Sequence, residues 1–410
     1  MIQVSDKTKC CGCTACASSC PKKCITMQYD EEGFLYPVID KASCVNCGIC
    51  DKVCPFGHLN DKAITNSSTY MAFQNSKQDI RMNSTAGGAF SLIAEYIISN
   101  GGVVYAVGYN AKMVVCHKKC SSIEGLSELR GSKYVQSDLR NIFIDIKLHL
   151  EKRLVLFVGT PCQVQGLKAF IGDNRKLYTI DLLCLGVSSP KLFAEWIDYL
   201  SDKYHSQVQR VSFRDKHYGY ATPNVRVFFE NGRSMDQKYD TKVHANLFFT
   251  HYNVRPSCYE CQFREVPRVS DFTIGDFNEI GSINKKMDDD KGTTKVWIHT
   301  ERGKELFKAM ESSAVYYTIE KNSSNIIGGP KKQMKIPEMR TAFFTDTLKM
   351  SYSDLISKWQ PRNVKGELAG VLRPLINMLP FKTKIFQYLR KKRIKEYEKN
   401  VRDLNPNIRE

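Results

Sequence analysis

The chain has 410 residues, of which 42% are hydrophobic, so it can form a sizeable core divided over two or three domains. Its 60 basic and 43 acidic residues give a formal charge of +17, which suits an acidic protein, a nucleotide or a membrane surface as partner. The sequence has no apolar run of membrane-spanning length and its first residues lack an apolar signal segment, so with 16 cysteines we expect a protein of the reducing cytoplasm.

A repeated cysteine motif opens the chain. The pattern C-x2-C-x2-C-x3-C-P occurs twice, at Cys10, Cys13, Cys16 and Cys20 and again at Cys44, Cys47, Cys50 and Cys54. In this pattern three closely spaced cysteines bind one [4Fe–4S] cube, and the cysteine before the proline binds the other cube. We therefore predict one cluster held by Cys10, Cys13, Cys16 and Cys54, and a second held by Cys44, Cys47, Cys50 and Cys20.

Zinc and disulfide bonds fit this motif less well. Structural zinc sites usually take two separated cysteine pairs, and a disulfide framework belongs to secreted chains. The segment instead resembles the bacterial two-cluster ferredoxins, which store or relay electrons, so the rest of the chain should hold the reaction that uses them. Cys11 and Cys24 are left without a ligand role. Each oxidised cube carries about −2, which lowers the charge of the loaded protein to about +13.

A small-residue turn follows a polar linker predicted over 56–69. A short strand over 70–74 comes first, and the run Ser84-Thr85-Ala86-Gly87-Gly88-Ala89 then leads into an apolar helix over 90–98. Small residues at a helix start leave free amides beside the positive end of the helix dipole, which suits phosphate. The signal is weak alone, because a Gly-Gly helix start is as often only a turn, and the run is neither a G-x-G-x-x-G nor a Walker motif.

The middle of the chain alternates strands, turns and helices. A buried-type strand over 154–158 is followed by a tight turn and a helix, which puts Cys162 at a strand-to-helix junction, and Cys184 follows a strand over 177–183. Open α/β folds bind ligands at such junctions, and a helix start favours thiolate. Strands dominate from about 205, followed by the C-x2-C pair Cys258 and Cys261 and a short strand ending at Asp276. The repeats indicate an α/β core with some parallel pairing.

Seven sequence blocks occur in one order: STAGGAFS, GSKYVQS, GTPCQVQGL, IDLLCLGVSSP, SFRDK, the C-x2-C pair and SDFTIGDF. This arrangement resembles the β-subunit family of the coenzyme F420 hydrogenases and dehydrogenases over about residues 5–320. The resemblance implies FAD and iron–sulfur clusters as cofactors and a deazaflavin or another small organic molecule as substrate. We therefore expect an α+β protein with a two-cluster ferredoxin-type domain over 1–62, a mixed α/β flavin-binding catalytic domain over 68–340 and a basic helical extension over 341–410.

The resemblance also implies site residues. Ser84, Thr85, Gly87 and Gly88 would hold the FAD phosphates, and the flavin or substrate would be surrounded by Thr160, Gln163, Arg214, Asp215 and Asp271. Candidates for the reaction itself are Cys162, Lys133 and Asp276. Cys162, Cys184, Cys258 and Cys261 match the cysteines of the family's catalytic domain and would hold a third [4Fe–4S] cluster, because a cube needs four thiolates. The alternative is a half-formed zinc knuckle at Cys258 and Cys261 with an inert Cys184.

A basic helix is predicted near the end of the chain. Phe381, Ile385, Phe386 and Leu389 mark one apolar face, and lysines and arginines crowd the remainder. Such a helix is ordinarily exposed to solvent without a partner. The alternative interpretation is that it binds an anionic membrane or an acidic partner protein. We expect no nucleic acid as partner, because no reading motif accompanies the charge.

Three functions fit these observations. The favoured one is an iron–sulfur flavin-dependent oxidoreductase that relays electrons between a donor or acceptor protein and an organic two-electron substrate. The first alternative is a non-catalytic electron-transfer subunit that serves a partner redox enzyme. The second alternative is a thiol enzyme with Cys162 as nucleophile, which ranks low because no histidine lies near Cys162 in the sequence.

Overall fold

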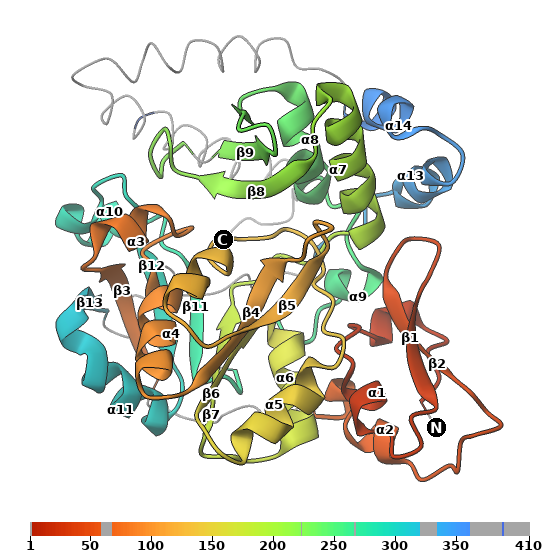
Figure 1. Ribbon diagram of the computed structural model, residues 1–410, viewed down its shortest axis with the longest axis horizontal. Coiled ribbons are helices and arrows are strands. Elements are labelled where there is room, and N and C mark those ends of the chain that lie inside the picture. The colour runs from red at the N-terminus through yellow and green to blue at the C-terminus, as the bar shows by residue number, and fades with distance from the viewer. Residues whose placement is uncertain are drawn as a thin grey trace, which may run out of the picture.

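The computed structural model describes residues 2–58, 68–222, 224–265, 268–319 and 334–360, together with residue 388. These residues form a mixed α/β structure with a 2-stranded, a 3-stranded and an 8-stranded sheet (Figure 1). Within the described ranges, no helix is both long enough and apolar enough to cross a lipid bilayer. The mixture of sheets and helices agrees with the α+β class expected from the sequence.

The two copies of the cysteine motif fold alike. Each copy carries a short helix around its third cysteine, α1 (Ala15–Ser19) or α2 (Ile49–Lys52), and the residue that precedes each helix has a positive φ, 65° at Thr14 and 71° at Gly48. Between the copies, β1 (Ile25–Tyr29) pairs antiparallel with β2 (Leu35–Ile39). The short turns η1 (Lys7–Lys9) and η2 (Pro55–His58) flank the pair of motifs. The sequence repeat is therefore also a structural repeat.

The large sheet has the strand order β13-β3-β12-β11-β7-β6-β4-β5. Its strands are β3 (Thr69–Asn75), β4 (Val103–Tyr109), β5 (Val115–Cys120), β6 (Val155–Gly159), β7 (Leu177–Leu182), β11 (Phe272–Asp276), β12 (Thr294–Ile298) and β13 (Ala314–Thr318). The four central strands β4, β6, β7 and β11 run parallel, and the outer strands pair antiparallel. Their carboxyl ends therefore meet at one edge of the sheet, which is where open α/β folds bind ligands.

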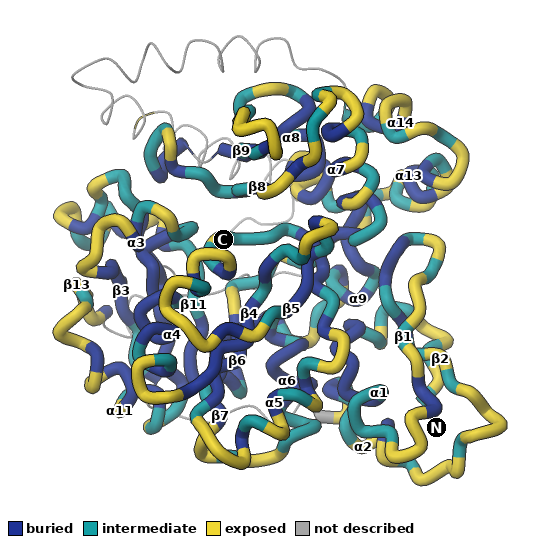
Figure 2. Tube along the Cα trace, in the orientation of Figure 1, coloured by how far each residue is buried: buried dark blue, intermediate teal, exposed yellow. Residues whose placement is uncertain are grey.

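Helices cover both faces of this sheet (Figure 1). Helices α4 (Ala89–Ser99) and α11 (Glu301–Met310) bury their apolar residues in one core cluster, and α5 (Ile142–Leu150) and α6 (Pro161–Ile171) bury theirs in a second cluster. The second cluster also contains Cys11, Cys13 and Ala15 of the cysteine repeat. The repeat thus packs directly on the α6 side of the sheet, and Figure 2 shows α1 next to α5 and α6.

A smaller unit lies above the carboxyl edge of the large sheet (Figure 1). It consists of α7 (Pro190–Tyr204), β8 (Val208–Asp215), β9 (Asn224–Phe229), β10 (Ser234–Met235) and α8 (Tyr239–Phe249), with its own apolar core around Trp196 and Phe213. The remaining elements are α3 (Gln78–Met82), η3 (Glu124–Glu128), α9 (Pro256–Tyr259), α10 (Ile280–Ile283), η4 (Lys285–Met287), η5 (Glu311–Ser313), α13 (Arg340–Thr347) and α14 (Tyr352–Trp359). The smaller unit therefore covers the carboxyl edge of the large sheet.

The end of the chain divides into two parts. Residues 341–360 of the predicted basic extension belong to the folded body, because α13 and α14 bury Phe343, Phe344 and Leu355 against Phe34 and Leu247. The apolar face predicted at Phe381, Ile385, Phe386 and Leu389 lies outside the described residues, as does 59–67 of the predicted linker.

Candidate functional site

An outer cavity lies between the second cysteine motif and the end of the first. The cysteines that line it are Cys20, Cys24, Cys44, Cys47 and Cys50. Four of these, Cys20, Cys44, Cys47 and Cys50, are the set predicted to hold one cluster. Cys20, the last cysteine of the first motif, therefore lies with the three cysteines of the second motif. Cys24 is an additional thiol in this cavity, with its Sγ 3.4 Å from that of Cys20. Cys47 and the neighbouring Val45 are exposed, which leaves this cavity near the surface.

An inner cavity lies between the first motif and the end of the second. The cysteines that line it are Cys10, Cys11, Cys13, Cys16 and Cys54, which include the set predicted for the other cluster. Burial raises the pKa of Cys16 to about 12, and the thiols of Cys10, Cys54 and Cys50 contribute to that rise. Cys16 is therefore close to Cys50 of the outer set as well as to its own set, so the two cavities are neighbours.

A third group of cysteines gathers at the carboxyl edge of the large sheet. Cys162 starts α6 after β6, Cys184 follows β7, Cys258 is in α9 and Cys261 follows α9. Burial raises the pKa of Cys258 well above its ordinary value, and Cys184, Cys261 and Cys162 raise it further. Burial and then Cys162 also raise the pKa of Cys184, to about 12. The fold thus brings together the four cysteines that the resemblance suggested as a third ligand set.

Four cysteines in one place could hold either a zinc ion or a four-iron cube. No three His, Cys, Asp or Glu side chains within the described ranges converge as ligands of one metal ion. Four sulfurs around a zinc ion lie about 3.8 Å from one another, given Zn–S bonds of about 2.3 Å, whereas a four-iron cube needs a wider spacing. Thiols that raise one another's pKa would be relieved of that repulsion by binding iron, because a coordinating thiol loses its proton.

Cys11 connects the inner cavity to the third group. Its thiol lies close to both groups, because Cys13 raises the pKa of Cys11 and Cys11 in turn raises the pKa of Cys162. The ring of Phe56, which follows the second motif, also packs edge-on against Phe263, which follows Cys261, with centroids 5.2 Å apart. The three cysteine groups therefore form a series from the exposed motif to the edge of the sheet.

Gly166 of α6 sets how closely the first motif approaches the third group. A Cβ at this position would lie 2.7 Å from Sγ of Cys13 and 3.0 Å from its Cβ. We expect Gly166→Ala to displace Cys13 and to lower the free energy of unfolding by about 1–3 kcal/mol, although alanine is the better helix former. Anaerobic urea denaturation checks this. Gly57→Ala is the matched control, since its nearest contact is 3.9 Å away; a Gly166→Ala protein as stable as wild type would contradict the close approach.

The loop of residues 84–88 lies at the same edge of the sheet, between β3 and α4. Its side chains are used to fix the loop: Ser84 Oγ donates to the carbonyl of Ile80, Thr85 Oγ1 contacts Ser132 Oγ at 3.1 Å, and the Gly87 amide donates to Thr294 Oγ1. Gly88 caps α4 with a φ of 85°. The groups left for a ligand are the first amides of α4, which have no acceptor within the helix.

An ion pair lies across the edge of the sheet from this loop. Arg214 at the end of β8 donates to Asp276 at the end of β11, at 2.6 Å, and also contacts the hydroxyl of Tyr134 at 3.4 Å. Within the described part of the chain, the buried Nε of Arg214 has no acceptor. Asp215 accepts a hydrogen bond from the amide of His217 at 3.0 Å. Arg214 therefore has a donor available for a ligand.

Two lysines near this edge are fixed by backbone carbonyls. The ammonium group of Lys133 donates to the carbonyls of Val107, Leu129 and Arg130. The ammonium group of Lys216 donates to the carbonyls of Arg81, Ala86 and Lys291. Burial lowers the pKa of both lysines to about 7. Lys216 holds the 84–88 loop against the smaller unit, which sequence reasoning missed. The reaction role of Lys133 remains a prediction, and its contacts are those of a structural group.

Three predicted ligand-contacting residues have structural contacts instead. The side chains of Thr160 and Gln163 form the capping box of α6, and Gln163 also donates to Ser137 Oγ. Asp271 is fully buried and accepts hydrogen bonds from Thr179, Thr300 and Arg302. It precedes β11 and so lies at the opposite edge of the sheet from Asp276, about 16 Å away for five residues of strand. The contacts of Asp271 are those of a structural group, and its place around the flavin or substrate remains a prediction.

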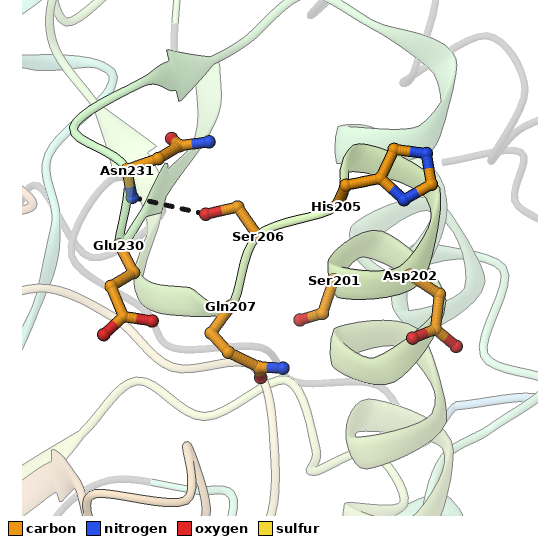
Figure 3. Close-up of a pocket in the computed structure, with 7 residues that line it drawn as sticks. All are labelled: Ser201, Asp202, His205, Ser206, Gln207, Glu230 and Asn231. Carbon is orange, nitrogen blue, oxygen red and sulfur yellow. Dashed lines mark hydrogen bonds between the residues drawn. The ribbon is translucent and has the colours of Figure 1, made fainter.

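A surface hollow in the smaller unit is separate from all of these groups (Figure 3). It is lined by Ser201, Asp202, His205, Ser206, Gln207, Glu230 and Asn231, and the Asn231 amide donates to Ser206 Oγ at 3.2 Å. The hollow lies at the far end of α7, about 20 Å from the end that follows Cys184. It contains no cysteine and none of the predicted site residues, so it has no part in the site.

Comparison with known proteins identifies two parts of the chain. Residues 9–58 match the family model of a 4Fe-4S dicluster domain, and residues 152–324 match that of the C terminus of the coenzyme F420 hydrogenase/dehydrogenase beta subunit. A chain of the xenon-derivatised F420-reducing [NiFe] hydrogenase complex from Methanosarcina barkeri aligns at 16% identity over 72% of this chain and 94% of that chain, with a TM-score of 0.43. No curated protein matches.

The two family matches agree with the geometry of the cysteines. The two cavities of the repeated motif and the dicluster match define an iron–sulfur protein of the oxidoreductase class. Residues 152–324 are thus a C-terminal domain of the coenzyme F420 hydrogenase/dehydrogenase β-subunit type, and a 4Fe–4S dicluster domain precedes it at residues 9–58.

Proposed function

We propose that the chain is an iron–sulfur flavin-dependent oxidoreductase, in which electrons pass between an external protein at the outer cavity and an organic substrate at the edge of the large sheet. The observation that carries this proposal is the series of three cysteine groups, linked by Cys16 near Cys50 and by Cys11 between Cys13 and Cys162. When bound, the clusters supply one-electron transfer and FAD supplies two-electron transfer, which couples a one-electron partner to a two-electron substrate.

The third cysteine group would hold a third [4Fe–4S] cluster. Its support is that Cys162, Cys184, Cys258 and Cys261 are largely withdrawn from water and lie close enough to shift one another's pKa, as the ligands of one buried cluster would. Cys162 cannot be both a metal ligand and a nucleophile at the same time. We assign it as a ligand, which removes the basis for a thiol enzyme.

FAD would bind between the 84–88 loop and the ion pair of Arg214 with Asp276. The first amides of α4 offer donors and the positive end of a helix dipole to a diphosphate. The unused Nε of Arg214 offers a further donor toward the same edge. Asp276 would orient Arg214, because the two side chains are 2.6 Å apart. The contribution of this chain is therefore to hold the flavin at the end of the cysteine series.

The partner protein would dock where the outer cavity reaches the surface. Cys47, Val45 and Ile49 are exposed there, and the exposed Lys22 lines the same cavity. An apolar centre with a lysine beside it favours an acidic electron-carrier protein, whose approach would weaken with salt.

A turnover assay separates this function from the alternative of an electron-transfer subunit. The purified, anaerobic, chemically reduced protein is mixed with a deazaflavin or with a dye that flavins reduce. We expect the protein alone to reduce the acceptor repeatedly while reductant lasts. Full cluster content with no turnover in the absence of a partner enzyme would instead support the non-catalytic role.

A further inference from the structure

A completely buried arginine lies between the inner cavity and the third cysteine group. Arg255 immediately precedes α9, which contains Cys258, and its side chain is 0% exposed. Its guanidinium donates to the carbonyls of Cys10 at 2.9 Å and Leu35 at 3.0 Å and to Oε1 of Gln136 at 2.8 Å. It also contacts Sγ of Cys10 at 3.7 Å. The cation therefore touches a predicted ligand of the inner cluster.

Arg255 differs from the other buried arginines in its countercharge. The buried Arg81 and Arg268 pair with Asp289 and Asp181, at 2.5 and 2.9 Å, and the half-buried Arg302 and Arg340 pair with Asp271 and Glu32, each at 2.6 Å. Among the described residues, the hydrogen-bond partners of Arg255 are neutral oxygens and one thiol, with no carboxylate. A buried charge without an opposite charge is costly, so the site requires an anion that the side-chain carboxylates do not supply.

The surrounding chain is shaped to bring this cation close to the first motif. Gly12, between two predicted ligands, has a φ of +67°, and a Cβ there would lie 2.8 Å from Nε2 of Gln136 and 3.0 Å from a terminal nitrogen of Arg255. The ring of Tyr36 stacks below the guanidinium at 4.2 Å. Gln136 in turn donates to the carbonyl of Cys11. Arg255 is thus held in one position by groups from three segments: the first motif itself, residues 35–36 and Gln136.

We propose that Arg255 is the internal countercharge of the inner cluster and that it raises the reduction potential of that cluster relative to the outer one. A cation and a hydrogen bond at a ligand sulfur stabilise the reduced cluster more than the oxidised cluster, because reduction adds a negative charge. Electrons entering at the outer cavity would then move favourably toward Cys162. The inference rests on the iron–sulfur part of the proposed function and is independent of flavin binding.

The test is an EPR-monitored redox titration of the full-length protein with its clusters, comparing wild type, Arg255→Gln and Arg255→Lys. We expect Arg255→Gln to make reduction of one cluster about tenfold less favourable, which for a one-electron couple is a shift of about 59 mV to lower potential. The outer cluster serves as the internal control and should not shift. Arg255→Lys, which keeps the charge, should shift less. Unchanged potentials in an iron-replete Arg255→Gln protein, or an equal shift of every cluster, would overturn the proposal.

A second measurement uses the wild-type protein and so does not depend on a variant that folds. Pulsed EPR of reduced protein grown with ¹⁵N-arginine should show an arginine nitrogen coupled to the inner cluster, and Arg255→Lys should abolish that coupling. Absence of any arginine coupling in the wild-type signal of the inner cluster would refute the contact. If the arginine coupling and the potentials were as expected but the protein showed no turnover, the proposed flavin site would be wrong and the proposal for Arg255 would stand.

Discussion

Cys258→Ala is expected to lose about four irons per chain and essentially all acceptor reduction, while the two clusters of the repeated motif remain. The physical reason is that Cys258 lies close to the other three cysteines of the third group, since Cys184, Cys261 and Cys162 all raise the pKa of its thiol. A cube with three thiolates in such a site is weakly held. Iron analysis, EPR of the reduced protein and the acceptor assay together measure the loss.

Cys116→Ala is the matched control for this variant. Cys116 is a buried thiol in β5, bridged to Asp138, and it is none of the predicted cluster ligands. Its replacement should leave the iron content and activity unchanged. If Cys258→Ala retained all of its iron, the third group would be four inert thiols, and the path from Cys11 to the flavin would have no carrier.

Asp271→Ala is expected to destabilise the protein by about 3–5 kcal/mol without changing the chemistry of any cluster. Its carboxylate accepts from Arg302 at 2.6 Å, from Thr300 at 2.7 Å and from the amide of Thr179 at 2.8 Å, and it is 0% exposed. Removing it leaves Arg302 and two donors without their acceptor next to the central strands. Anaerobic urea unfolding, followed by the fluorescence of Trp297, measures the change.

The pH dependence of this contribution follows from the sign of the pKa shift. Burial opposes the charge of Asp271, but Lys168 and Arg302 lower its pKa below the ordinary 3.8. The stabilisation is therefore present above that value and is lost as the pH falls through the lower, folded value. Asp202→Ala, on the rim of the surface hollow, is the control and should change stability by no more than about 0.5 kcal/mol. Equal stability losses for the two variants would contradict the buried role of Asp271.

The sequence predicted the two cysteine cavities because their ligands are local. Each motif places three cysteines within one turn, so spacing alone identifies the set, and the crossing of Cys20 and Cys54 follows from the known geometry of the pattern. The structure groups those cysteines in the same way. The third group could not be found by spacing. Cys162 and Cys184 meet only because β6 and β7 are parallel neighbours, and Cys258 arrives on α9 from a distant segment.

Asp271 and Arg255 show the limits of reading polar residues from the sequence. Asp271 and Asp276 frame the same short strand, but only the second is at the carboxyl edge, and strand direction decides which one can face a ligand. No sequence motif around Arg255 predicts that its side chain lies beside the first cysteine motif. Its importance comes from Cys10 and Gln136, which are distant in sequence, and from the absence of a carboxylate partner among the described residues.

We propose that three iron clusters lead to one flavin in this protein. Anaerobically purified full-length protein should contain about 12 irons and one FAD per chain, and reduction of the clusters should bleach the flavin absorbance. Colourless protein with zinc in place of iron, or an iron-loaded protein that binds no flavin, would contradict the account.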